Sequence, residues 1–165
     1  MAVRNMTRCG LFAAMLAVCA WLSLPLGGVV ISLQSFGVML ALATLGGKRG
    51  SIAVAVYLAL GAVGGPVFTG FRGGVSAFLD PTGGYLWGFM AGALVYWLLE
   101  KRLPVWGNLT LALAVCYGCG TVYYALAYGG SFWAVAMVCV VPYLLPDAVK
   151  LGLALLLSRR LKKFA

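Results

Sequence analysis

The chain contains no histidine and very few acidic residues. Asp and Glu together number 3 among 165 residues, whereas Lys and Arg number 12. Histidine is the side chain most often used for proton transfer near neutral pH and for binding metals. Without it, and with so few carboxylates, the residues available for enzymatic chemistry are scarce. We therefore expect neither an enzyme, nor a metal site, nor a bound cofactor.

Charge of either sign is also scarce. Only 9% of the residues are charged and 64% are hydrophobic, whereas a soluble domain is about 25% charged. A soluble fold cannot hide this much apolar surface, but a lipid bilayer can accept it. The composition and length predict one membrane domain over residues 1–165, with an all-α fold.

The five cysteines are scattered and odd in number, so a disulfide framework is not expected. Cys116 and Cys119 form a CxxC pair inside an apolar run. We interpret them as small buried side chains of a helix in preference to a metal or redox site.

The beginning of the chain has some features of a signal peptide. Arg4 and Arg8 precede an apolar run over residues 11–24, the pattern of a basic start and a short apolar core. The rest of the chain is equally apolar, so we interpret this run as the first membrane helix. Pro25 and the pair Gly27-Gly28 are expected to end it.

Hydrophobic runs of helical length follow one another along the chain, separated by glycine, proline and charged residues. They predict six membrane helices, over residues 10–24, 32–45, 51–63, 82–100, 109–128 and 143–161. Residues 131–141 are expected to form a further short helix lying across the bundle. Asp80 is a suitable N-cap for the fourth membrane helix, with Pro81 at its first position.

The basic residues predict the topology. With six spans, one side of the membrane receives ten of them: Arg4, Arg8, Lys48, Arg49, Lys101, Arg102, Arg159, Arg160, Lys162 and Lys163. The positive-inside rule makes that side cytoplasmic, together with both termini. The net charge of +9 is thus a topology signal, and we expect no nucleic-acid partner.

Glycine is concentrated between the third and fourth predicted helices. Ten of the 23 glycines lie between Gly61 and Gly92. Glycine lets the backbone bend sharply and approach a ligand closely. We expect this extracellular loop to help form and close a pocket for a small molecule.

Four charged residues remain for the outer half: Arg72, Asp80, Asp147 and Lys150. Ionisable groups at membrane depth are costly and usually functional. Asp147 and Lys150 are three residues apart and share one helix face, where they could clamp a neutral ligand such as a cyclic urea. The alternative is an ion pair that holds the last helix to a neighbour. Gln34 points to the same half, with an interhelical hydrogen bond as its alternative.

Several motifs together resemble one family. They are GxPVF at 64–68, the pair Gly73-Gly74, PTGGY at 81–85 followed by Gly88-Phe89, Ser32-Leu33-Gln34, and PDxxK at 146–150. In this order and over nearly the whole chain they resemble the BioY family, the biotin-specific substrate-binding (S) components of energy-coupling factor (ECF) transporters. Where this chain has Asp80, we expect glycine in the family, which favours a capping role for that residue.

The resemblance implies high-affinity capture of biotin from outside the cell, followed by uptake with a transmembrane coupling subunit and two ATPase subunits. Residues 46–49 lack the upstream glycine and the Ser/Thr of a phosphate loop, so ATP hydrolysis falls to the partners. Ala13 and Ala17 form a small-xxx-small pair that the resemblance assigns to the coupling-subunit contact. Packing inside the chain's own bundle is the alternative.

Biotin has an apolar ring system and a carboxylate tail. Phe68, Tyr85 and Trp87 are candidates to pack on the ring, although aromatic residues are more often part of a core. The carboxylate could bind Arg72 or the N–H groups at the helix start formed by Thr82 and Gly83. An S component for another vitamin, and a structural membrane protein, remain as alternatives.

Overall fold

The computed structural model describes residues 3–26 and 29–162. Within these ranges the chain forms eight helices and one two-stranded sheet. In order they are α1 (Val3–Trp21), β1 (Ser23–Leu26), β2 (Val29–Ser32), α2 (Gln34–Leu45), α3 (Gly47–Ala62), α4 (Ser76–Leu79), α5 (Gly83–Leu99), α6 (Val105–Tyr128), α7 (Phe132–Cys139) and α8 (Val141–Leu161).

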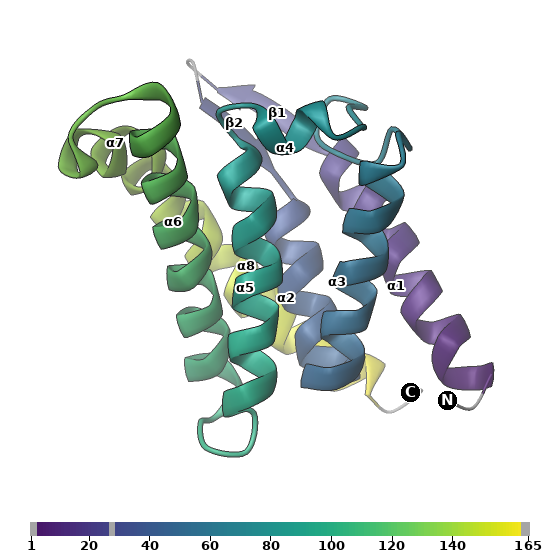
Figure 1. Cartoon of the computed structure of the whole chain (residues 1–165). Helices are drawn as coiled ribbons and strands as arrows, with labels where there is room; N and C mark the ends of the chain where they lie inside the picture. Colours follow the sequence, from purple (N-terminus) through teal and green to yellow (C-terminus); the bar gives the residue numbers. More distant parts are fainter. Residues whose placement is uncertain (1–2, 27–28, 163–165) are drawn as a thin grey trace.

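The long helices form a bundle with two different ends (Figure 1). The β1–β2 hairpin, α4 and α7 gather at one end, which we call the hairpin end. The beginning of α1, the α5–α6 connection and the end of α8 lie at the opposite end. α8 packs mainly against α2. Both terminal helices therefore start or finish on the same side of the molecule.

The hairpin was not expected from the sequence. β1 and β2 pair antiparallel, with Leu24 opposite Ile31, and α1 ends at Trp21. Pro25 disfavours a continuation of α1, and the β-branched residues of β2 favour a strand, so residues 23–26 and 29–32 leave the helical pattern. Gly27 and Gly28, expected to end the first helix, lie outside the described residues, as does Lys163.

A glycine stripe brings α5 and α6 together. Gly84, Gly88 and Gly92 recur every fourth residue, so they lie on one face of α5. A Cβ atom at Gly88 would lie 2.7 Å from the carbonyl oxygen of Cys116, and one at Gly92 would lie 2.5 Å from that of Ala112. The backbones can approach this closely only because these side chains are missing.

Asp80 does not cap the fourth membrane helix, contrary to the sequence-based prediction. α5 begins at Gly83, its N-cap residue is Thr82, and no side chain caps it. Asp80 follows α4, and its backbone carbonyl accepts a hydrogen bond from the Gly83 N–H at 2.7 Å. Its carboxylate instead binds Arg72, and this competing partner takes it away from the helix start.

Four helices begin earlier than expected. α1 begins at Val3 rather than at residue 10, and α6 begins at Val105 rather than at residue 109. α3 begins at Gly47 rather than at residue 51. α8 begins at Val141, so Pro142 lies in its first turn and Pro146 inside it. Pro142 is compatible with a helix start because the first N–H groups of a helix have no internal partner. The stretch 131–141 contains the short helix α7.

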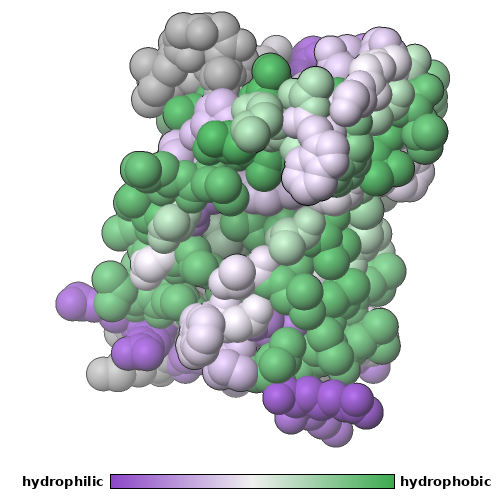
Figure 2. Space-filling view, turned by 90° about the vertical axis from the view of Figure 1, so that its left-hand side faces the viewer, coloured by the Kyte–Doolittle hydropathy of each residue, from purple (hydrophilic) through white to green (hydrophobic). Residues whose placement is uncertain are grey.

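The side of the molecule seen in Figure 2 carries a broad hydrophobic surface, with hydrophilic residues concentrated along its lower edge. Among the described residues, α6 and α8 are long and apolar enough to cross a membrane by length and composition. α2 and α5 are shorter apolar helices. An apolar surface of this kind is suited to contact with lipid.

Candidate functional site

A buried ion pair lies on α8. The Nζ atom of Lys150 is 2.6 Å from Oδ1 of Asp147, and both side chains are less than a tenth exposed. Their spacing places them on one face of the helix, which is the face turned toward α2. The shared face was predicted from the spacing, and the contact itself is the ion pair that the sequence left as the alternative. A clamp for a ligand at this pair stays a prediction.

Three further groups complete the hydrogen bonding of the pair. Ser35 Oγ on α2 donates to Asp147 Oδ1 at 2.9 Å, and the Tyr117 hydroxyl on α6 donates to Asp147 Oδ2. Lys150 Nζ donates to the backbone carbonyl of Ser32 at 2.8 Å and to Ser35 Oγ at 3.1 Å. The ion pair thus joins α8 to α2, to α6 and to the last residue of β2.

Gln34 belongs to a neighbouring network. Its Nε2 donates to the Tyr57 hydroxyl at 2.8 Å, and that hydroxyl donates to the Val67 carbonyl at 3.1 Å. Thr69 Oγ1 donates to Gln34 Oε1 at 3.3 Å. Gln34 therefore connects the start of α2 to α3 and to the glycine-rich loop. Its bond to Tyr57 is the interhelical hydrogen bond that was the alternative to a binding role.

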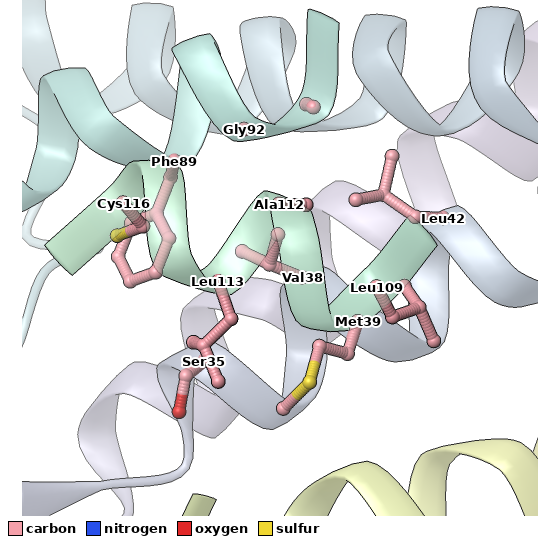
Figure 3. A pocket seen from close by; sticks show the side chains of 11 residues that line it. Ser35, Val38, Met39, Leu42, Phe89, Gly92, Leu109, Ala112, Leu113 and Cys116 are labelled. Atoms are coloured by element: carbon pink, nitrogen blue, oxygen red, sulfur yellow. The ribbon is translucent and has the colours of Figure 1, made fainter. Parts of the chain in front are cut away.

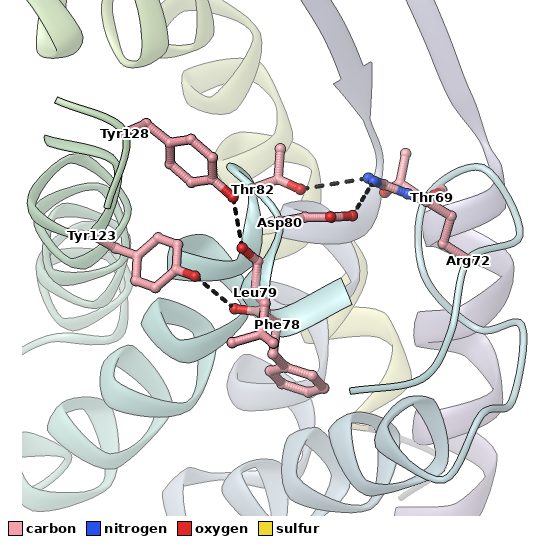
Figure 4. Close-up of polar contacts among 8 residues, drawn as sticks. All are labelled: Thr69, Arg72, Phe78, Leu79, Asp80, Thr82, Tyr123 and Tyr128. Carbon is pink, nitrogen blue, oxygen red and sulfur yellow. Dashed lines mark hydrogen bonds and ion pairs between the residues drawn. The ribbon is translucent and has the colours of Figure 1, made fainter. Parts of the chain in front are cut away.

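Arg72 is engaged by its own chain. Its Nη1 is 2.8 Å from Asp80 Oδ2, and its Nη2 is 3.5 Å from Thr82 Oγ1 (Figure 4). The side chains of Arg72 and Asp80 are 50% and 40% exposed. A partly exposed pair of this kind is weak, so the guanidinium can exchange partners. The structure brings Arg72 and Thr82 together, beside the start of α5 at Gly83.

The predicted aromatic residues lie in different surroundings. Phe68 is buried, and its ring packs edge-on against Tyr57 and Phe78. The Tyr85 hydroxyl donates to the Cys139 carbonyl at 3.2 Å. Trp87 is more than half exposed and packs against Phe78.

The hairpin end is held to the glycine-rich loop by an aromatic residue. The indole N–H of Trp21 donates to the Pro66 carbonyl at 2.8 Å, and its ring stacks on Phe71 with centroids 5.1 Å apart. Phe71 has a φ of 58°, a backbone conformation that residues other than glycine rarely adopt. These contacts hold the loop beside the end of α1.

Ala13 and Ala17 are buried in the chain's own core, against neighbouring helices of the bundle. Their packing matches the internal alternative. A coupling subunit could reach these two side chains only if α1 moved away from α2 and α3.

Sequence reasoning missed Ser35, Tyr117 and the Ser32 carbonyl. Ser35 directly follows Gln34, and Tyr117 directly follows Cys116, but neither residue type is unusual in a membrane helix. Only the packing of α2, α6 and α8 brings these groups to the carboxylate and the ammonium. The available signal for Ser35 was its position directly after Gln34, a polar residue of the outer half.

A small cavity of about 20 Å³ lies among α2, α5 and α6, next to this network. Ser35 contributes its polar lining, and the remaining side chains are mostly apolar (Figure 3). In the part of the chain that the structure describes, no cluster of three or more potential metal-binding side chains occurs. The described site is therefore built from hydrogen-bonding groups and one ion pair.

Comparisons with known proteins agree with one another. The family model described as "BioY family" matches residues 1–165. The chain is 41% identical to the biotin transporter BioY of Thermotoga maritima, covering 98% of this chain and 97% of the relative. It is 37% identical to the biotin transporter BioY of Rhodobacter capsulatus, covering 98% and 94% of the two chains.

A solved structure gives the same result for the fold. The crystal structure of the S-component for biotin from an ECF-type ABC transporter superposes with a TM-score of 0.84 at 28% identity, over 98% of this chain and 92% of that one. The full-length match to the family, the close relatives and the shared fold together place this chain in the BioY family.

Proposed function

We propose that this chain captures biotin as the substrate-binding component of an ECF-type transporter. The observation that carries the proposal is the buried Asp147–Lys150 pair, in a chain of the BioY family with the fold of a biotin S-component. A buried charge pair is expensive to keep in a membrane helix, and such pairs usually serve function.

The pair supplies the groups that a cyclic urea needs. A carboxylate accepts hydrogen bonds and an ammonium donates them. One N–H group of the ureido ring would donate to Asp147, and the adjacent C=O would accept from Lys150. Charged partners make these hydrogen bonds stronger than bonds between neutral groups.

The remaining parts of biotin would face the glycine-rich loop and the start of α5. Phe68 and Tyr85 would provide apolar surface, and Gln34 a further polar group, after exchanging their present contacts within the chain. Arg72, which already lies beside Thr82, would exchange Asp80 for the carboxylate of the ligand. The Gly83 N–H already donates to the Asp80 carbonyl at 2.7 Å, so the start of α5 would attract an anion through its helix dipole.

The same proposal includes a multi-pass arrangement in the cytoplasmic membrane. The six spans would be α1, α2, α3, α5, α6 and α8, with the glycine-rich loop outside. The basic residues at the end opposite the hairpin, Lys48, Arg49, Lys101 and Arg102 among them, support a cytoplasmic location of that end and of both termini.

Uptake would require partners. The chain has no phosphate loop, so a transmembrane coupling subunit and two ATPase subunits would supply the energy of ATP hydrolysis. This assignment of partners is supported by the likeness to an S-component of an ECF-type transporter.

The test is a binding assay on the detergent-purified protein with radiolabelled biotin, using thiamine and riboflavin as controls. Saturable binding of biotin alone is expected. Binding of another vitamin in its place would reassign the ligand, and absence of any vitamin binding would refute the S-component function.

A further inference from the structure

Lys150 uses all of its hydrogen-bond donors within the chain. An ammonium has three N–H groups, and Nζ has three acceptors: Asp147 Oδ1 at 2.6 Å, the Ser32 carbonyl at 2.8 Å and Ser35 Oγ at 3.1 Å. A ligand carbonyl can bind this ammonium only by displacing one of them.

Asp147 accepts three hydrogen bonds within the chain, one fewer than the roughly four that a carboxylate can accept. Oδ1 already accepts from Lys150 and from Ser35, and Oδ2 accepts from the Tyr117 hydroxyl. The Tyr117 hydroxyl occupies one side of Oδ2. A ligand N–H that approaches Oδ2 from that side must replace it.

Two of these internal partners have the chemistry of a urea. The Ser32 group is an amide carbonyl that accepts from Lys150, as a ureido C=O would. The Tyr117 group is a neutral donor to Asp147, as a ureido N–H would be. These two groups belong to β2 and α6, so both can withdraw without breaking the ion pair, which lies within α8.

Space leads to the same conclusion. The cavity beside Ser35 measures about 20 Å³, room for about one water molecule. Pockets for small organic ligands usually measure roughly 300 Å³ or more. A ligand that entered this cavity beside Ser35 would therefore have to move side chains or backbone aside.

We propose that the Tyr117 hydroxyl and the Ser32 carbonyl are internal competitors for the ligand at the Asp147–Lys150 pair. The inference rests on the proposed function. A ligand N–H displaces Tyr117 from Asp147 Oδ2, and the ligand C=O displaces Ser32 from Lys150. Because Ser32 is the last residue of β2, the second exchange also releases the hairpin from α8, so ligand binding and hairpin position are coupled.

The competition can be measured by removing the hydroxyl. In Tyr117→Phe, Asp147 Oδ2 loses its internal partner, and a buried acceptor without a partner is costly. The ligand then restores a bond instead of replacing one. We expect Tyr117→Phe to bind biotin about fivefold to tenfold more tightly than wild type, with a lower melting temperature before biotin is added and a larger rise afterwards.

Tyr123→Phe is the matched control on the same helix. The Tyr123 hydroxyl donates to the Phe78 carbonyl at 3.1 Å (Figure 4) and does not bind Asp147. Tyr123→Phe removes a hydroxyl of the same kind, but this hydroxyl does not compete for Asp147. The variant should therefore bind biotin with the affinity of wild type. If Tyr117→Phe cannot be purified folded, Tyr117→Met removes the same hydroxyl while filling the space with a flexible apolar side chain.

The outcomes separate the two proposals. Weaker or unchanged biotin binding in the Tyr117 variant, with wild type binding normally, would overturn the competition and leave the biotin function intact. Failure of wild type itself to bind biotin would overturn the proposed function and this inference with it.

Discussion

At the scale of single residues, the site depends on a charge pair that is costly to bury. Taking an ammonium and a carboxylate out of water is offset only when each finds a close partner and its remaining hydrogen bonds are made. Asp147 and Lys150 meet this condition through Ser35, Tyr117 and the Ser32 carbonyl. Changing either member would leave the other buried without its partner.

Asp147→Asn and Lys150→Ala should each weaken biotin binding at least tenfold, because each variant removes a charged group that the ureido ring would bind and strands the other. Equilibrium binding of radiolabelled biotin to purified protein measures this. Glu100→Gln and Lys48→Ala make the same chemical changes at the opposite end of the bundle and should bind normally. Near-normal affinity in both site variants would remove these two residues from the site.

Arg72→Ala should lower the affinity for biotin by a few-fold and leave the affinity for a biotin amide almost unchanged. The exposed guanidinium contributes modestly, as exposed ion pairs do, and only a charged carboxylate benefits from it. Competition binding with the acid and the amide, using Lys101→Ala as the control, measures the difference. Equal losses for the two ligands would exclude pairing with the carboxylate.

At the scale of elements, the α5–α6 contact holds one wall of the site in place. Gly88 and Gly92 let the two backbones meet, and Tyr117 and Tyr85 project from this helix pair. The regular spacing of these glycines is visible in the sequence. Their partner helix is not, because spacing defines a face but does not identify what packs against it.

Gly88→Leu should destabilise the protein by roughly 1–3 kcal/mol, since the added side chain would collide with α6 at Cys116. Gly118→Leu is the control, because a Cβ atom at Gly118 meets nothing within 4 Å. The melting temperatures of the two variants in detergent are compared, with unfolding measured as the loss of monodisperse protein. Equal melting temperatures for the two variants would show that the close contact is not needed.

Some elements could be derived from the sequence and others could not. Apolar runs bounded by glycine and charge indicated where most long helices lie, and the PDxxK spacing indicated one face for Asp147 and Lys150. The hairpin formed by residues 23–26 and 29–32 was missed because the stretch between residues 24 and 32 was interpreted only as a break between two helices. Asp80 was misassigned because the local capping pattern did not reveal Arg72, which reaches it across the loop.

At the scale of the whole molecule, the two ends differ in charge and in structure. The hairpin, α4 and α7 lie at one end (Figure 1), close to the network around Asp147. The other end carries Lys48, Arg49, Lys101 and Arg102. A bundle with these ends, inserted with the basic end inside, would present the ion-pair site toward the outer surface.

This orientation can be tested with single cysteines in a cysteine-free background. Val75→Cys at the hairpin end should react with a membrane-impermeant thiol reagent in intact cells, because Val75 is well exposed. Lys101→Cys at the other end should react only after the membrane is permeabilised. The reverse pattern would invert the topology.

The central claim is that the buried pair on α8 recognises the urea of the vitamin, and a structure of this chain with biotin bound tests it most directly. The account predicts one ureido nitrogen within hydrogen-bonding distance of the Asp147 carboxylate and the ureido oxygen within that distance of Lys150 Nζ. Biotin bound elsewhere, with Tyr117 and Ser32 still attached to an undisturbed pair, would contradict it.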